Sequence, residues 1–162
     1  MSKGIKAFEN AMKKKIKNQN KIPKSLLLNI ILKELRDKGN FLSCVLTDTN
    51  GFIIGEAIHP RDNKDNLQAT SALITNTSER ISDYLKLDKI HFSYFVSNDT
   101  IVWLKVIKMA KSKDKFILLV TKRNSLINKM TNSTLKLLGK EKINVPEYLD
   151  VTSKWILNYC YP

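Results

Sequence analysis

The sequence predicts an α+β fold, a three-layer α/β/α sandwich in which a five-stranded antiparallel sheet lies between helices. The first observation is the order of the periodic segments, α-β-β-α-β-β-β-α, with an extension at each end of the chain. The second is that the strand segments carry apolar residues on both faces, whereas a sheet with one wet face alternates apolar and polar residues. The third is that 162 residues, 43% of them hydrophobic, suffice for one domain with a real core.

Residues 1–22 form a basic N-terminal arm, in which seven lysines accompany a single acid, Glu9. Apolar residues recur every three or four positions along this arm, which is the spacing of one side of a helix. The stripe consists of Ile5, Phe8, Met12 and Ile16. Three interpretations stay open: a helix packed on the domain, a disordered arm, and an amphipathic helix in weak contact with an anionic membrane surface.

The central domain, residues 23–140, begins with a helix. Pro23 suits its first turn, and Gly39 is a natural stop after it. Its buried face consists of Leu27, Leu28, Ile31, Leu32 and Leu35. Strands are predicted over 41–47 and 52–58, because Asn50-Gly51 between them accepts the positive φ angles of a tight hairpin turn.

A long helix over residues 65–86 organises the domain, and either Asn63 or Asp65 caps it. One narrow apolar stripe is predicted to face the sheet, and it consists of Leu67, Ile74, Ile81 and Leu85. A shoulder beside it consists of Thr70, Leu73, Thr77 and Tyr84. Small residues fill the middle of the helix, so another backbone can come close. The apolar arc is wide enough for two partners, its own sheet and a second helix.

Three further strands are predicted over 90–96, 100–109 and 116–120. Asn124 begins a last helix, which Gly139 ends. The C-terminal extension, residues 141–162, contains the large apolar residues Trp155, Ile156 and Tyr159. We expect these to dock, either on the same subunit or on a partner.

The sequence shows no convergent set of catalytic residues, so we expect neither an enzyme nor a bound cofactor or metal. The glycines form no phosphate-binding loop. His59 and His91 are the only histidines, and neither has a second ligand within sequence reach. Cys44 and Cys160 have no metal or redox spacing. The apolar runs are too short for a membrane helix and the N-terminus lacks a signal-peptide core, which predicts a cytoplasmic protein.

The net charge of +13 raises the question of nucleic acid. Only four of the 28 basic residues are arginine, however, and lysine lacks the bidentate fork that favours base and phosphate recognition. A codon bias toward A and T explains the excess of lysine equally well. In addition, the aromatic residues of the strands fall where helices should cover them, not on an open basic face. The sequence therefore argues against a nucleic-acid-binding module.

This order of elements resembles the Roadblock family, the dynein light-chain type within the longin-like superfamily. The resemblance covers residues 23–139 and rests on four features: the leading helix that stops at Gly39, the hairpin with Asp48-Thr49-Asn50-Gly51 at its tip, the long small-residue-rich helix, and the run of strands over 90–121. The chain departs from the family in its lysine-rich arm, its threonine-rich long helix and its C-terminal extension.

The resemblance implies a dimer in which strand 90–96 pairs with its copy across a two-fold axis and the long helices lie antiparallel. The implied interface residues are Leu73, Thr77, Tyr84, Ile90, Phe92, Tyr94 and Val96. It also implies a non-catalytic scaffold, possessing no cofactor, that binds a Ras-like small GTPase or another Roadblock-type subunit. The polar side of the long helix offers candidate partner contacts, namely Asn76, Glu79, Arg80 and Asp83.

Two alternatives share the architecture. A longin- or profilin-like trafficking adaptor also covers both faces of a five-stranded sheet, although such domains usually begin with strands and this one begins with a helix. A small-molecule sensor domain of related shape would need a cavity beneath the sheet.

Overall fold

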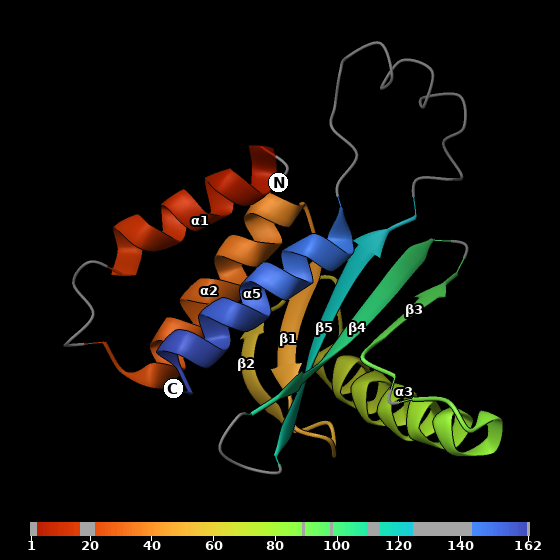
Figure 1. Cartoon of the computed structure of the whole chain (residues 1–162). Coiled ribbons are helices and arrows are strands. Elements are labelled where there is room, and N and C mark those ends of the chain that lie inside the picture. The colour runs from red at the N-terminus through yellow and green to blue at the C-terminus, as the bar shows by residue number, and fades with distance from the viewer. Residues whose placement is uncertain are drawn as a thin grey trace.

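The computed structural model describes residues 3–16, 22–88, 90–97, 99–109, 114–124 and 144–161 (Figure 1). In chain order the elements are α1 (Lys3–Ile16), α2 (Lys24–Gly39), β1 (Ser43–Thr47), β2 (Ile53–Ala57), α3 (Lys64–Leu85), β3 (Phe92–Val96), β4 (Thr100–Lys108), β5 (Lys115–Arg123) and α5 (Val145–Tyr159). The helix predicted to run from Asn124 to Gly139 falls beyond these described ranges.

The five strands form one antiparallel sheet in the order β2-β1-β5-β4-β3. The β1–β2 hairpin closes as its sequence predicts. Asp48 Oδ1 accepts hydrogen bonds from the backbone N–H groups of Asn50 (2.8 Å) and Phe52 (2.9 Å), and Gly51 has a φ of 91°. This order leaves β2 and β3 at the two edges of the sheet.

Helices cover both faces of the sheet, which confirms the α+β class and the three-layer prediction (Figure 1). Along β5, Phe116, Leu118 and Val120 belong to the core beneath α1, α2 and α5. The intervening residues Ile117 and Leu119 belong to the smaller core beneath α3. The period of two along a strand therefore divides the apolar side chains between the two helical layers.

Helix α1 packs on the domain, which is one of the three interpretations of the basic arm. Its apolar stripe, Ile5, Phe8, Met12 and Ile16, is buried. Lys15 of α1 forms an ion pair with Glu34 of α2, whose side chain is nearly buried. A Cβ atom on Gly4 would lie only 2.2 Å from the Tyr148 hydroxyl oxygen, so glycine permits the close approach of α1 to α5.

Helix α5 lies along α2 within the same chain (Figure 1). Trp155 and Ile156 are buried, and the Tyr148 hydroxyl donates a hydrogen bond to the Lys38 carbonyl oxygen at 3.0 Å. Trp155 and Ile156 therefore dock on their own subunit, whereas Tyr159 stacks on Trp155 and is 39% exposed. The division of the chain after residues 22 and 140 stays a prediction.

Helix α2 ends one residue later than predicted. Asn40, not Gly39, is the left-handed residue, with a φ of 52°. Gly39 is instead required by packing, because a Cβ atom there would lie 2.0 Å from Cε2 of Phe41. At the start of α3, Asn63 is the cap. Its side-chain oxygen accepts from the N–H groups of Asp65 (2.8 Å) and Asn66 (3.2 Å).

The side of α3 that faces the sheet differs from the predicted one. Leu67 and Ile74 are buried as expected, but Ile81 is 42% exposed and Leu85 is more exposed still. The centre of the sheet-facing side is a line of hydroxyl residues spaced four, three and four apart, Ser71, Thr75, Ser78 and Ser82. The prediction that Ile81 and Leu85 face the sheet is therefore wrong.

Candidate functional site

Strand β3 is an edge strand whose outer backbone groups have no strand beside them in the described sheet. Two backbone hydrogen bonds mark the ends of the β3–β4 pairing. The His91 carbonyl accepts from the Val106 N–H at 2.9 Å, and the Ser97 N–H donates to the Thr100 carbonyl at 2.9 Å. In an antiparallel pair, every second residue directs its backbone N–H and C=O groups toward the neighbouring strand. Since residues 91 and 97 bond to β4, the backbone groups of residues 92, 94 and 96 point away from β4. Their N–H and C=O groups form a template for another strand.

Both faces of β3 carry exposed apolar side chains. Tyr94, opposite Trp103, lies on the face of the sheet that α5 covers, yet it is 63% exposed. Val96 shares that face and is also exposed. Phe95 lies on the other face, and it is exposed as well. A strand that is apolar on both faces suits the interior of a sheet, not its edge.

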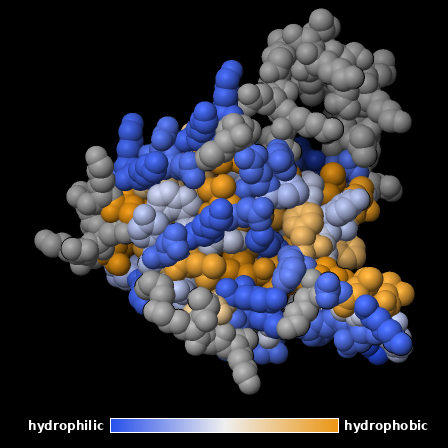
Figure 2. Space-filling view, in the orientation of Figure 1, coloured by the Kyte–Doolittle hydropathy of each residue, from blue (hydrophilic) through white to orange (hydrophobic). Residues whose placement is uncertain are grey.

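The outward side of α3 and the segment after it extend this apolar surface. Tyr84 is 82% exposed and Leu73 is 67% exposed. We define the α3–β3 surface as the eight exposed large apolar residues Leu73, Ile81, Tyr84, Leu85, Leu87, Tyr94, Phe95 and Val96. Figure 2 shows apolar residues gathered where α3 and β3 reach the surface. Exposed large apolar residues gathered on neighbouring elements are typical of interaction sites in folded proteins.

The structure exposes five of the seven residues implied as a dimer interface: Leu73, Thr77, Tyr84, Tyr94 and Val96. The other two, Ile90 and Phe92, are half-buried and line a cavity behind the surface. Phe95 and Leu87, which are not among the implied interface residues, are exposed as well. The apolar residues on both faces of strand 90–96 were the signal for Phe95.

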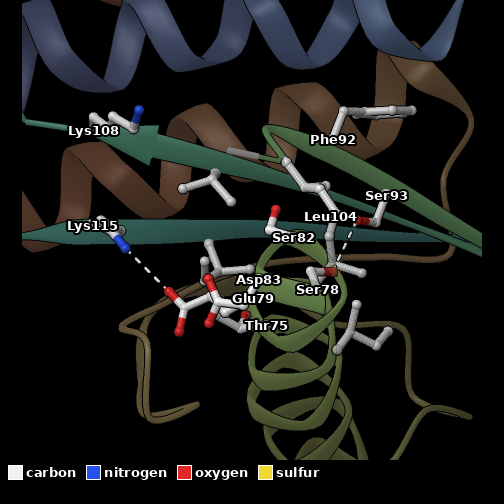
Figure 3. A pocket seen from close by; sticks show the side chains of 14 residues that line it. Thr75, Ser78, Glu79, Ser82, Asp83, Phe92, Ser93, Leu104, Lys108 and Lys115 are labelled. Carbon is white, nitrogen blue, oxygen red and sulfur yellow. Dashed lines mark hydrogen bonds and ion pairs between the residues drawn. The ribbon is translucent and has the colours of Figure 1, made fainter. Parts of the chain in front are cut away.

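That cavity has a volume of about 260 Å³ and lies between the C-terminal half of α3 and strands β3 to β5 (Figure 3). Its sheet wall is apolar and is formed by Leu104, Val106 and Ile117. Its helix wall is polar and includes Ser78 and Ser82. Because serine side chains are short, they leave unfilled the space that leucines at those positions would occupy.

Four charged residues are among those that line the cavity. Glu79 and Asp83 come from α3, whereas Lys108 and Lys115 come from β4 and β5. Lys115 Nζ lies 3.1 Å from Glu79 Oε1, and this ion pair spans the two walls (Figure 3). Of the candidate partner contacts, Glu79 and Asp83 therefore border the cavity, while Asn76 and Arg80 are exposed on α3.

The two thiols are buried in the larger core. Burial raises the pKa of Cys44 well above its ordinary value and raises the pKa of Cys160 to about 11. Both are therefore protonated near neutral pH, and a protonated thiol is a poor nucleophile. His59 Nδ1 accepts a hydrogen bond from Arg61 N–H at 3.2 Å within its own loop.

Within the described ranges, no three His, Cys, Asp or Glu side chains cluster as a metal site would require. The same part of the chain contains no helix with the length and apolar character needed to cross a membrane.

No protein-family model and no curated protein matches the sequence. The fold, however, is similar to solved structures. MglB from Myxococcus xanthus superposes with a TM-score of 0.58 at 11% identity, over 81% of this chain and 92% of that one. An MglB structure with a tetrameric arrangement gives a TM-score of 0.60 at 10% identity, over 86% and 91% of the two chains.

A Roadblock/LC7 domain from Streptomyces avermitilis gives a TM-score of 0.51 at 11% identity, over 83% of this chain and 98% of that one. At these identities the likeness concerns the fold alone. The element order, the sheet topology and these superpositions agree, and the chain has a Roadblock-type, longin-like fold.

Proposed function

We propose that this chain is a non-catalytic scaffold that forms a two-fold dimer, with itself or with another Roadblock-type subunit, and binds a Ras-like small GTPase. The observation that carries the proposal is the α3–β3 surface on a Roadblock-type fold. An unpaired edge strand with three exposed large apolar residues, beside five more on α3 and the segment after it, is costly to leave in water.

In the proposed dimer, β3 pairs with β3 of the second subunit, so that the two sheets become one. This pairing would satisfy the outward N–H and C=O groups of residues 92, 94 and 96. The second copy of α3 would then cover the exposed side of Leu73 and Tyr84. A closed two-fold pair presents the same surface from each subunit, which is the commonest form of oligomer.

The proposal that the partner is a small GTPase is supported by the resemblance to Roadblock domains and by the fold shared with MglB. The exposed polar residues Asn76 and Arg80 of α3 provide the proposed contact. A scaffold without catalytic residues can still act on a GTPase by ordering the residues of the GTPase itself.

A second candidate contact is electrostatic attraction of α1 to an anionic membrane surface. The apolar stripe of α1 is buried against the domain, while Lys3, Lys6, Lys13 and Lys14 are exposed. In such a contact the lysines would be attracted to the membrane surface while no side chain of α1 enters the lipid. Each lysine near an anionic membrane surface contributes about 1 kcal/mol to the free energy of binding. It would weaken steeply as salt increases.

Light scattering on the purified chain tests the dimer, and we expect twice the mass of one chain at micromolar concentration. Tyr94→Pro should give a folded monomer, because it removes an N–H that faces away from β4 and leaves the β3–β4 bonds in place. Tyr94→Thr, which keeps that N–H and has high strand propensity, is the matched backbone control and should retain more of the dimer. A wild-type monomer would refute the homodimer.

Pull-down with Ras-like GTPases from the same organism, loaded with GDP or with a non-hydrolysable GTP analogue, tests the partner. We expect one nucleotide state to be retained more strongly than the other, because γ-phosphate contacts order the switch segments of a Ras-like GTPase and so change its surface. Failure of every GTPase in both states to bind would refute this part of the proposal and leave the dimer standing.

A further inference from the structure

The C-terminal half of α3 turns a polar side toward an apolar sheet. Ser71 and Thr75 begin the line of hydroxyl residues, and their hydroxyls are satisfied by Thr47 (2.6 Å) and by the Ser71 carbonyl (2.8 Å). Farther along, Ser78 shares a hydrogen bond with Ser93 of β3 (3.2 Å) and the Ser82 hydroxyl donates to the Asp88 carbonyl (3.3 Å), and both serines line the cavity. A helix that only had to cover this sheet would carry leucine or isoleucine at those positions.

The size of the cavity suits a small organic molecule. An apolar cavity of roughly 150 Å³ holds a benzene ring. A volume of about 260 Å³ therefore accommodates a ring or a branched alkyl group together with a few polar atoms. Leu104, Val106 and Ile117 provide the apolar wall for such a group, and the hydroxyls of Ser78 and Ser82 face it.

The charges around the cavity are balanced and each wall carries one sign, with Lys115 and Glu79 paired across the two walls at 3.1 Å. The sheet contributes two cations, Lys108 and Lys115, and the helix contributes two anions, Glu79 and Asp83. A ligand with a single charge would meet an attractive and a repulsive wall together. A ligand that carries a carboxylate and an ammonium group can satisfy both walls with charge-assisted hydrogen bonds.

We propose that this cavity binds a small zwitterion with an apolar side group, the chemical class of the large neutral α-amino acids. The side group lies against Leu104, Val106 and Ile117, the carboxylate is held by Lys108 and Lys115, and the ammonium group is held by Glu79 and Asp83. This site is independent of the proposed scaffold function. The cavity lies next to the α3–β3 surface, because α3 and β3 form walls of the cavity and also carry that surface.

Calorimetric titration of the full-length chain tests the ligand class with three probes that share one ring. L-Phenylalanine carries both charges, 3-phenylpropanoate carries only the carboxylate, and 2-phenylethylamine carries only the ammonium group. We expect one saturable site for L-phenylalanine and at least tenfold weaker binding of each analogue. No saturable binding of L-phenylalanine or L-leucine up to the millimolar range, or equal binding of all three probes, would overturn the proposal.

Two charge variants test the assignment of the walls without touching the core. Lys108→Gln should weaken the binding of L-phenylalanine and of 3-phenylpropanoate severalfold and leave the affinity for 2-phenylethylamine unchanged. Asp83→Asn should weaken the binding of L-phenylalanine and of 2-phenylethylamine and leave the affinity for 3-phenylpropanoate unchanged. If both variants leave the affinity for L-phenylalanine unchanged, the proposed orientation of the ligand is wrong and the proposal fails.

A filling variant tests the location. Ser82→Leu places a larger side chain in the cavity and should abolish binding of L-phenylalanine. Ser25→Leu makes the same change at an exposed serine of α2, on the other side of the sheet, and should leave binding intact. Binding that survives Ser82→Leu in a folded chain would overturn the proposal. Light scattering on the same samples keeps the tests separate, since a dimer that binds no L-phenylalanine refutes only the ligand site.

Discussion

The side-chain oxygens of Ser78 and Ser93 lie 3.2 Å apart, and their hydrogen bond joins the C-terminal half of α3 to the edge strand β3. Ser93 lies opposite Leu104 in the sheet, on the face that α3 covers. The bond thus connects the two elements that carry the α3–β3 surface, at the edge of the cavity between them (Figure 3).

We expect Ser78→Ala and Ser93→Ala each to lower the free energy of unfolding by about 0.5–1.5 kcal/mol, the usual contribution of one hydrogen bond. Because each single variant already removes the bond, the double variant should cost clearly less than the sum of the two. Urea denaturation of the four proteins measures this double-mutant cycle. Additive costs would show that the two hydroxyls do not interact in solution.

Tyr84→Glu and Tyr94→Glu should each weaken the proposed dimer at least tenfold while the subunit stays folded. Both side chains are largely exposed in the single subunit, so a charge there disturbs the interface and not the core. Phe52→Glu is the matched control, because Phe52 is 67% exposed and lies at the tip of the β1–β2 hairpin. Sedimentation equilibrium gives the dissociation constants.

Equal weakening of the dimer by Phe52→Glu would show that an added negative charge anywhere on the chain has this effect.

Ile74→Asp cannot test the dimer, because Ile74 lies in the core beneath α3 and its replacement by a charge should unfold the chain. Phe92→Lys is ambiguous for the same reason, since Phe92 packs partly against the larger core.

Replacement of Tyr148 tests whether α5 belongs to the folding unit. Its ring contacts Phe8 and Phe41 edge-on, and its side chain is almost fully buried. Tyr148→Ala should therefore lower the free energy of unfolding by about 3–5 kcal/mol. Tyr148→Phe keeps the ring and removes only the hydrogen bond to Lys38, so it should cost about 1 kcal/mol. A small cost for Tyr148→Ala would mean that α5 docks weakly.

Thiol reactivity should follow the raised pKa values of Cys44 and Cys160. At pH 8 neither thiol of the folded chain should react with a chromogenic disulfide until denaturant is added. Since the folded state favours the protonated thiols, stability is fully present below the ordinary thiol pKa and falls as pH rises above it. Rapid reaction of the native protein at pH 8 would contradict the burial of both residues.

The candidate partner contacts on α3 are tested by Arg80→Ala and Glu79→Ala, neither of which should impair folding. We expect Arg80→Ala to weaken GTPase binding severalfold, because Arg80 is exposed on α3. Arg80 lies one helical turn before Tyr84, so light scattering on the same sample separates this effect from a loss of the dimer. Arg61→Ala, an exposed arginine in the loop before α3, is the matched control. If both α3 variants bind the GTPase as the wild type does, the contact lies elsewhere.

Local patterns in the sequence were sufficient for the order of the elements from α2 to β5 and for most of their boundaries, while the helix predicted from Asn124 to Gly139 stays a prediction. The cap at Asn63, the turn at Gly51 and the apolar residues of β5 each depend on neighbours within a few positions. Such features follow from backbone conformation and short-range hydrogen bonds. The docking of Trp155 on its own subunit was left open by the sequence, because that choice depends on contacts with the distant helix α2.

The sequence by itself determined that α3 is a long helix with more apolar surface than one sheet face can cover. Only the tertiary structure decided which side of that helix meets the sheet. The stripe ending at Leu85 and the line of hydroxyl residues ending at Ser82 are both helical repeats, and periodicity alone favours the more apolar one. Packing favours the other, because Ser71 hydrogen-bonds to Thr47 and Ser78 to Ser93 across the interface. Compared with the predicted orientation, α3 is therefore rotated about its own axis so that the hydroxyl residues face the sheet. This orientation leaves Tyr84 exposed and leaves the cavity beside the serines.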